Sequence, residues 1–131
     1  MSLKDIVGDY GFVAKVDVSN LDASTDWYQR NLGLRLDERY STPTWRQFGL
    51  FGSSRTAIGL NLNPAGVGSR GAVSTFVVVD IAAARKGLIA QGVAVGPIID
   101  VGHGVLLCFF KDPDCNSLGL RQNSKGQPNP A

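Results

Sequence analysis

The sequence predicts an α+β fold in which two tandem βαβββ units form a curved mixed sheet around a cleft, with the helices outside. Three observations carry this prediction. A strand–helix–strand pattern occurs twice, its two copies are offset by roughly sixty residues, and a glycine-rich segment separates them. One such unit cannot cover its own sheet, so we expect the two to pair. The prediction gives a single domain over 4–122, with units at about 10–62 and 72–122, and a disordered tail at 123–131.

The first unit begins with a strand at 12–18, where apolar side chains alternate with other residues. Asn20 or Asp22 can cap the helix that follows, because a short side-chain oxygen accepts an unpaired backbone N–H. Gly33 can end that helix. Three shorter strands complete the unit, at 34–40, 45–51 and 56–62.

The second unit repeats this order. A β-branched strand at 73–79 precedes a helix that Asp80 can cap and Gly92 can end. A strand at 93–99 and a hairpin follow, with the hairpin turn at Asp112-Pro113-Asp114. Proline presets φ for such a turn, and the flanking Asp and Asn side chains can bond the turn backbone.

Composition excludes several classes of function. The chain has 131 residues, of which 44% are apolar and 18% charged, as in ordinary folded domains. Thirteen basic and eleven acidic residues give a net charge of +2 without a basic cluster, so we expect neither a nucleic-acid partner nor a membrane partner. The sequence shows neither an apolar run of about 18 residues nor a signal segment, so we expect a cytoplasmic protein. Cys108 and Cys115 have the spacing of neither a disulfide framework nor a zinc site.

Several short motifs lie in a characteristic order along the chain. They are Val18-Ser-Asn-Leu-Asp22, Trp27-Tyr28, Asn31-Leu-Gly-Leu34, Val78-Val-Asp80, Ala90-Gln-Gly-Val93 and Phe110-Lys-Asp-Pro-Asp-Cys-Asn116. Their order and spacing, from about Phe12 to Arg121, resemble those of the vicinal oxygen chelate superfamily, which comprises glyoxalase I, bleomycin-resistance proteins and extradiol dioxygenases. The resemblance implies the glyoxalase/bleomycin-resistance-like fold described above.

The resemblance also locates a metal site, and this chain lacks its ligands. Enzymes of the superfamily usually hold a divalent metal on four strand positions occupied by His, Glu or Gln, where the cation polarises vicinal oxygens. Carried over by motif, these positions are Val13, Gly59, Val73 and Gly119. None of these side chains can ligate a metal, so we expect neither a metal nor another cofactor. His103, the single histidine, lies in a glycine-flanked loop outside these positions.

Glycine and valine at these positions predict an apolar and roomier cleft, suited to a flat or bulky apolar ligand. If Val13 faces this cleft, the alternation of a strand places Lys15 and Asp17 there as well. The candidate ligand-binding residues are Val13, Lys15, Trp45, Gly59, Asn61, Val73, Thr75, His103, Gly119 and Arg121.

Several of these residues have a second interpretation. Trp45 could stack on a planar ligand, or pack at a dimer or sheet interface. Lys15 and Asp17 could contact a ligand, or pair with neighbouring groups and solvent. His103 could act as a base or donor at the cleft rim, or be an ordinary loop residue. Cys115 replaces a glycine of the family's turn, and because positive φ costs a non-glycine residue about 1 kcal/mol, the turn could differ here.

Three functions remain open. The first is non-metal binding of a small organic molecule, similar to bleomycin- or mitomycin-sequestering proteins, which use clefts made with a second subunit and so imply a homodimer. The slightly basic charge favours a neutral or anionic aromatic ligand over cationic bleomycin. The second is a lyase, isomerase or dioxygenase-related enzyme whose metal-independent acid–base chemistry uses Lys15, Asp17 or His103. The third is a structural or regulatory domain with an empty cleft, which a cleft filled by side chains would favour.

Overall fold

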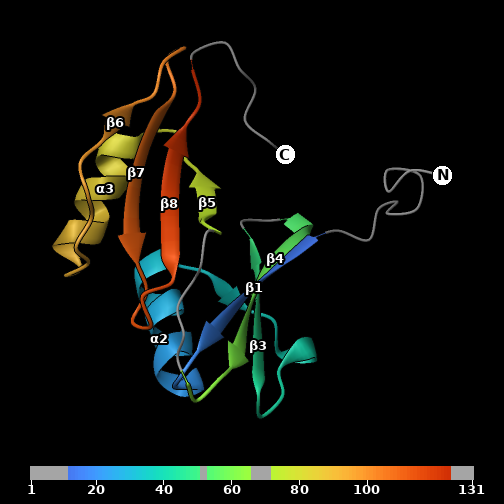
Figure 1. Ribbon diagram of the computed structural model, residues 1–131. Helices are drawn as coiled ribbons and strands as arrows, with labels where there is room; N and C mark the ends of the chain where they lie inside the picture. The colour runs from blue at the N-terminus through green and yellow to red at the C-terminus, as the bar shows by residue number, and fades with distance from the viewer. Residues whose placement is uncertain (1–11, 51–52, 66–71, 125–131) are drawn as a thin grey trace. The chain divides into compact units, whose positions relative to one another are not determined.

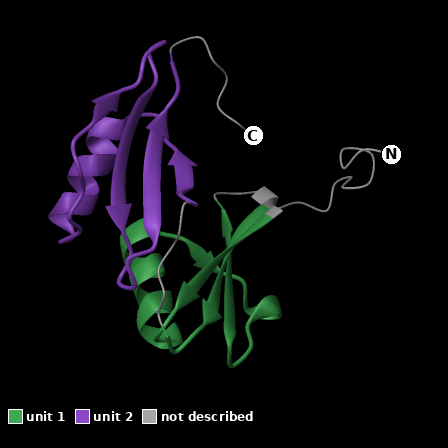
Figure 2. Cartoon of the chain, viewed as in Figure 1, with its two compact units in different colours: residues 1–66 green, residues 67–131 purple. Residues whose placement is uncertain are grey.

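The computed structural model describes residues 12–50, 53–65 and 72–124 (Figure 1). The chain divides into two compact units, residues 1–66 and 67–131, called unit 1 and unit 2 below (Figure 2). Each unit contains a four-stranded mixed sheet, packed against α2 in unit 1 and α3 in unit 2. The α+β class and the two βαβββ units are therefore confirmed. Most of the expected linker and tail, and the last residue of the strand predicted at 45–51, lie outside the described residues.

Unit 1 follows the predicted order of elements. These are β1 (Phe12–Val18), α2 (Leu21–Leu32), β2 (Arg35–Leu36), a 3-10 turn η1 (Glu38–Tyr40), β3 (Trp45–Leu50) and β4 (Ser53–Leu62). The strand order is β1-β4-β3-β2, and β1 runs parallel to β4. Asn20 caps α2, since its Oδ1 accepts the Ala23 N–H at 3.0 Å. Gly33 ends the helix with φ 65°, a conformation that glycine adopts without a steric penalty.

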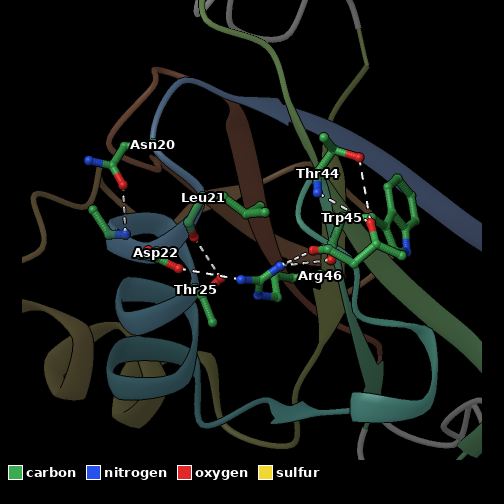
Figure 3. A network of polar contacts seen from close by, with 9 residues as sticks. Asn20, Leu21, Asp22, Thr25, Thr44, Trp45 and Arg46 are labelled. Carbon is green, nitrogen blue, oxygen red and sulfur yellow. Dashed lines mark hydrogen bonds and ion pairs between the residues drawn. The ribbon is translucent and has the colours of Figure 1, made fainter.

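The core of unit 1 lies between α2 and one face of its sheet. Tyr28 of α2 stacks on Phe48 of β3 with ring centroids 6.0 Å apart, and both side chains are fully buried. Arg46, next along β3 from Trp45, pairs with Asp22 of α2 at 3.4 Å and also donates to the carbonyls of Thr42 and Trp45 (Figure 3). This contact ties the start of β3 to the first turn of α2.

Unit 2 repeats the arrangement. Its elements are β5 (Ser74–Val77), α3 (Ile81–Ala90), β6 (Ile99–Asp100), β7 (Leu106–Lys111) and β8 (Ser117–Gln122). The order is β5-β8-β7-β6, with β5 parallel to β8. Asp80 caps α3 by accepting the Ala83 N–H at 3.1 Å, as predicted. Lys15 pairs with Gly59 in unit 1 and Thr75 with Gly119 in unit 2, so the two registers coincide after a shift of 60 residues (15 to 75 and 59 to 119).

Three predicted strands are shorter than expected. The strand predicted at 73–79 is reduced to the four residues of β5. The strand predicted at 34–40 is reduced to the two residues of β2, because the Asp37 carboxylate accepts the Arg39 backbone N–H and starts the 3-10 turn. In the stretch predicted as a strand at 93–99, Val95 makes an isolated bridge to Phe110, and β6 begins only at Ile99.

A side chain of α3 replaces the missing strand partner. Arg85 donates to the carbonyls of Gly96 at 2.7 Å and Val95 at 3.4 Å. Pro97 follows and has no N–H for a strand ladder. The segment is therefore held by the helix and by isolated contacts with β7, including the bond from the Gly96 N–H to the Phe109 carbonyl, rather than by a continuous ladder.

The hairpin turn of unit 2 is confirmed, and buried side chains build it. Asp112 Oδ1 accepts the backbone N–H groups of Asp114 at 2.9 Å and Asn116 at 2.8 Å, while Oδ2 accepts the Asn116 amide at 2.8 Å. Cys115 adopts φ 65°, and its N–H donates to the Asp112 carbonyl. These bonds hold Cys115 in a backbone conformation that usually belongs to glycine, so the turn accommodates cysteine without a change of conformation.

Candidate functional site

The site is built on the face of the unit 1 sheet that points away from α2, called the helix-free face below. Paired residues of neighbouring strands point to the same side, so the register defines rows across β1, β4 and β3. One row is Lys15–Gly59–Gln47, and the next is Asp17–Asn61–Trp45. Val13 begins the row before them, paired with Ala57. The intervening residues Val16 and Val18 are buried on the opposite, helix-covered side.

The indole of Trp45 lies over Gly59. A Cβ atom added to Gly59 would come within 2.0 Å of Trp45 Cζ2 and 2.2 Å of Cη2. The indole Nε1–H donates to Gln47 Oε1 at 3.2 Å, and the ring remains partly exposed. The expectation that Gly59 leaves open room was wrong, because the protein's own tryptophan fills the space that the missing side chain provides.

A polar cluster on β1 and β4 lies next to this indole. Asp17 accepts hydrogen bonds from the amides of Asn61 at 3.1 Å and Asn63 at 3.3 Å, and pairs with Lys15 at 3.2 Å. The Asn61 bond, followed by the Asn63 bond, holds the pKa of the Asp17 carboxyl below its usual value, against a smaller opposing effect of burial; Lys15 lowers it further. Lys15 and Asp17 therefore pair with each other, and their contact with a ligand stays a prediction.

The structure therefore brings five predicted residues onto one face. Val13 is 47% exposed, and Lys15, Trp45, Gly59 and Asn61 occupy the two adjacent rows. Gln47 was missed by the sequence reasoning. Its signal was present, since the alternation of the strand that contains Trp45 places Gln47 on the same side.

Unit 2 places its predicted residues on the equivalent face. Thr75 and Gly119 pair across β5 and β8, and Arg121 follows on the same side, where its Nε donates to Asn123 Oδ1 at 2.8 Å. Gly119 is also closely flanked, because an added Cβ would meet Thr75 Oγ1 at 3.1 Å and the Phe109 ring at 3.3 Å. Phe109, 41% exposed, was not predicted, because it lies in an apolar run that does not reveal its faces.

Two predicted positions of unit 2 lie outside its strands. Val73 immediately precedes β5 and is 43% exposed. His103 lies in the exposed loop between β6 and β7, with φ 55°. The pairing of β7 with β8 ends at Leu106–Gln122, so His103 lies beyond the end of the ladder that holds Gly119. It is not brought into the row of Thr75 and Gly119.

The four positions carried over from the metal site lie at equivalent places in the two units. Val13 precedes the Lys15–Gly59 pair by two residues, and Val73 precedes the Thr75–Gly119 pair by two residues. Their Val and Gly side chains contain no donor atom. Within the residues that the structure describes, His, Cys, Asp and Glu also form no group of three that could hold a metal ion. The residues present therefore do not fit the metal that the resemblance implies.

With the fold and the face established, comparison with known proteins assigns the family. The model of the Glyoxalase/Bleomycin resistance protein/Dioxygenase superfamily matches residues 13–120. The chain belongs to this superfamily. A search of curated proteins finds no match. None of the helices in the described parts of this superfamily member is long and apolar enough to cross a membrane.

Several solved structures share this fold. TnmS3, an antibiotic binding protein from Streptomyces sp. CB03234, is 26% identical with a TM-score of 0.74, over 91% of this chain and 99% of its own. An integron cassette protein from the mobile metagenome of Halifax Harbour Sewage Outfall is 22% identical with a TM-score of 0.74, over 86% and 97%. Lactoylglutathione lyase from Agrobacterium tumefaciens is 16% identical with a TM-score of 0.68, over 85% and 91%.

Proposed function

We propose that this superfamily member binds a planar organic molecule on the helix-free face of unit 1, without a metal. The observation that carries the proposal is the position of Trp45. Its indole lies over Gly59 and is partly exposed, so it offers an aromatic surface for stacking. The bond from Nε1 to Gln47 fixes the ring, which lowers the entropy that a ligand must overcome to order it.

Neighbouring groups support binding on this face. Exposed Val13 extends the apolar surface, and the Lys15–Asp17–Asn61 cluster supplies polar groups at its border. We propose separately that the equivalent face of unit 2, with Thr75 and Gly119, binds organic ligands of the same kind by itself. TnmS3, an antibiotic binding protein, has the same fold and 26% identity, which is compatible with this function.

The catalytic alternative has weaker support. The carboxylate of Asp17 accepts two amide bonds and pairs with Lys15, which lowers its pKa and makes it a poor proton acceptor near neutral pH. The structural alternative gains from the filled space over Gly59. Trp45 itself remains partly exposed, however, so the filled space still presents an aromatic surface to a ligand.

The two tryptophans allow a direct test. Trp27→Phe leaves Trp45 as the single tryptophan, and Trp45→Phe leaves only Trp27, which lies on α2 with its ring against Tyr28. In a panel of planar aromatic compounds, a ligand should quench Trp45 emission saturably and leave Trp27 emission unchanged. If no compound changes Trp45 emission saturably, and equilibrium dialysis finds no binding, the proposed function is wrong.

The homodimer expected from the resemblance stays a prediction. Sedimentation equilibrium of the full chain, with and without a ligand found in that panel, would measure the subunit number directly.

A further inference from the structure

The hydrogen bonds on the helix-free face of unit 1 fix the direction of its amide groups. The indole N–H of Trp45 can only donate, so Gln47 must turn its Oε1 toward the ring. The Gln47 NH2 group is then directed away from the indole, on the row that contains Gly59. By the same argument Asp17, which accepts only, takes the NH2 of Asn61 and leaves the Asn61 carbonyl as an acceptor in the next row.

Donors therefore lie on both sides of the strand that carries Gly59. Lys15 of β1 and Gln47 of β3 both pair with Gly59. Neighbouring strands are about 4.8 Å apart, so the two donor residues span roughly 10 Å, the width of a fused aromatic ring system. Lys15 has three N–H groups and forms one ion pair within the described parts of the chain, so further N–H groups can reach a ligand.

The exposed charge of this face is positive. The Lys15 side chain is 61% exposed, whereas its partner Asp17 is only 19% exposed. Arg35 pairs with Gly49 on the edge of the same face and is exposed. Asp37, whose N–H donates to the Gln47 carbonyl, is held by Arg39 at 2.8 Å. An approaching ligand therefore meets ammonium and amide N–H groups before it meets a carboxylate.

We propose that this face selects planar aromatic ligands that carry a carbonyl or carboxylate acceptor at the ring edge, and discriminates against aromatic cations, with Gln47 and Lys15 as the residues that determine this specificity. The inference rests on the proposed function, because it concerns which planar ligand binds rather than whether one does. Asn61 supplies an acceptor in the adjacent row, so a ligand donor is tolerated there.

A pair of probes with the same ring system and opposite charges tests the inference. Pyrene-1-carboxylate and pyrene-1-methylammonium share the ring system and differ in the sign of the charge. Equilibrium dialysis at low salt should show the carboxylate binding about tenfold more tightly, as expected for one hydrogen bond to a charged group. Lys15→Met should bring the two affinities to within about twofold of each other, while Lys86→Met, which removes an exposed charge from α3, should change neither.

A second pair of probes isolates the hydrogen bond from the charge. 9-Fluorenone and fluorene are both neutral, and only the ketone has an acceptor. The ketone should bind about five- to tenfold more tightly. Gln47→Glu keeps the acceptor for Trp45 Nε1 but replaces the NH2 with an oxygen, so it should abolish the preference for the ketone and raise the affinity for pyrene-1-methylammonium.

The outcomes separate this inference from the proposed function. If the ammonium probe binds as tightly as the carboxylate while both quench Trp45, the inference is overturned and the proposed function stands. If neither the pyrene probes nor fluorenone binds while another compound of the panel quenches Trp45 saturably, the inference is again overturned and the proposed function stands. If no compound of the panel binds, both are contradicted. An unchanged thermal transition of each variant shows that the altered affinity is not a loss of folding.

Discussion

Unit 1 and unit 2 have the same strand order and the same register after a shift of 60 residues. Different side chains, however, surround the equivalent glycines Gly59 and Gly119. In unit 1, Gly59 is covered by Trp45, which reaches diagonally from the next row of β3. In unit 2, Gly119 faces Phe109, which is its direct partner on β7. The comparison teaches that a glycine in a strand does not by itself predict open space; the residue that the neighbouring strand presents decides what fills it.

The polar groups differ as well. Position 15 carries the lysine that pairs with Asp17, while the equivalent residue of unit 2 is Thr75 and the equivalent of Asp17 is Val77. Unit 1 therefore combines an aromatic surface with charged and amide groups, whereas unit 2 exposes Phe109 without such a cluster on β5. This difference is the reason why we place the primary binding face on unit 1.

The largest effect is expected at the buried Asp112 in the hairpin turn of unit 2. Asp112→Ala removes the acceptor for two backbone N–H groups and the Asn116 amide, so it should destabilise the protein by about 3 kcal/mol in urea denaturation. Asp112→Asn keeps an acceptor for the backbone N–H groups, so it should destabilise the protein less than Asp112→Ala does. A loss below about 0.5 kcal/mol for the alanine variant would show that the turn does not depend on this side chain.

The two glycines offer the most direct comparison. Gly59→Ala places a Cβ inside the Trp45 ring, so the indole must move; we expect a cost of about 1–2 kcal/mol and a red shift of Trp45 emission in the Trp27→Phe background. Gly119→Ala requires its neighbours to give by only a few tenths of an ångström and should cost less than about 1 kcal/mol. If Gly119→Ala destabilises the protein more than Gly59→Ala does, the expected difference between the two glycines is contradicted.

The helix caps should behave alike, because the repeat is preserved there. Asn20 and Asp80 each accept the N–H of the third residue beyond them, at 3.0 and 3.1 Å. Alanine at either position should cost about 1 kcal/mol in thermal or chemical unfolding. Replacement of each by Ser should restore most of the loss. Clearly unequal losses would show that the two helices do not contribute equivalently.

The smallest effect concerns acid stability. The folded pKa of Asp17 lies below its usual value of 3.8, mainly because of the bond from Asn61. A lowered folded pKa stabilises the protein above the unfolded pKa, and this contribution is lost as pH falls toward the folded pKa. Asp17→Asn should therefore flatten the decline of stability below about pH 4, by less than about 1 kcal/mol, and leave the pH dependence between 5 and 7 unchanged. If Asp17→Asn leaves the decline of stability below about pH 4 unchanged, the lowered pKa of Asp17 is contradicted.

Much of the fold could be predicted because its signals are local. Asn20, Asp80 and the Asp112 turn each act within four residues, so a short stretch of sequence contains the whole interaction. The shortened strands could not be predicted in the same way. The carbonyls of Val95 and Gly96 are satisfied by Arg85, ten and eleven residues earlier, a contact that no propensity describes.

The candidate site was predictable in part for a similar reason. Alternation along β1 and β4 placed Lys15 and Asn61 on the correct face. The position of Trp45 over Gly59 depends on the register between β3 and β4, fixed by pairs such as Trp45–Asn61 that are distant in sequence. The sequence therefore placed Lys15 and Asn61 on one face, but it revealed neither Gln47 nor the indole that fills the space over Gly59.

The most direct test of the account is an NMR titration of 15N-labelled protein with pyrene-1-carboxylate, following the indole N–H signals of its two tryptophans. We predict that the Trp45 signal and the Gln47 side-chain amide shift together and saturate with one affinity, while the Trp27 signal does not move. Shifts that affect Trp27 and the surface of α2 but leave Trp45 and Gln47 unchanged would contradict the claim that the helix-free face of unit 1 is the binding site.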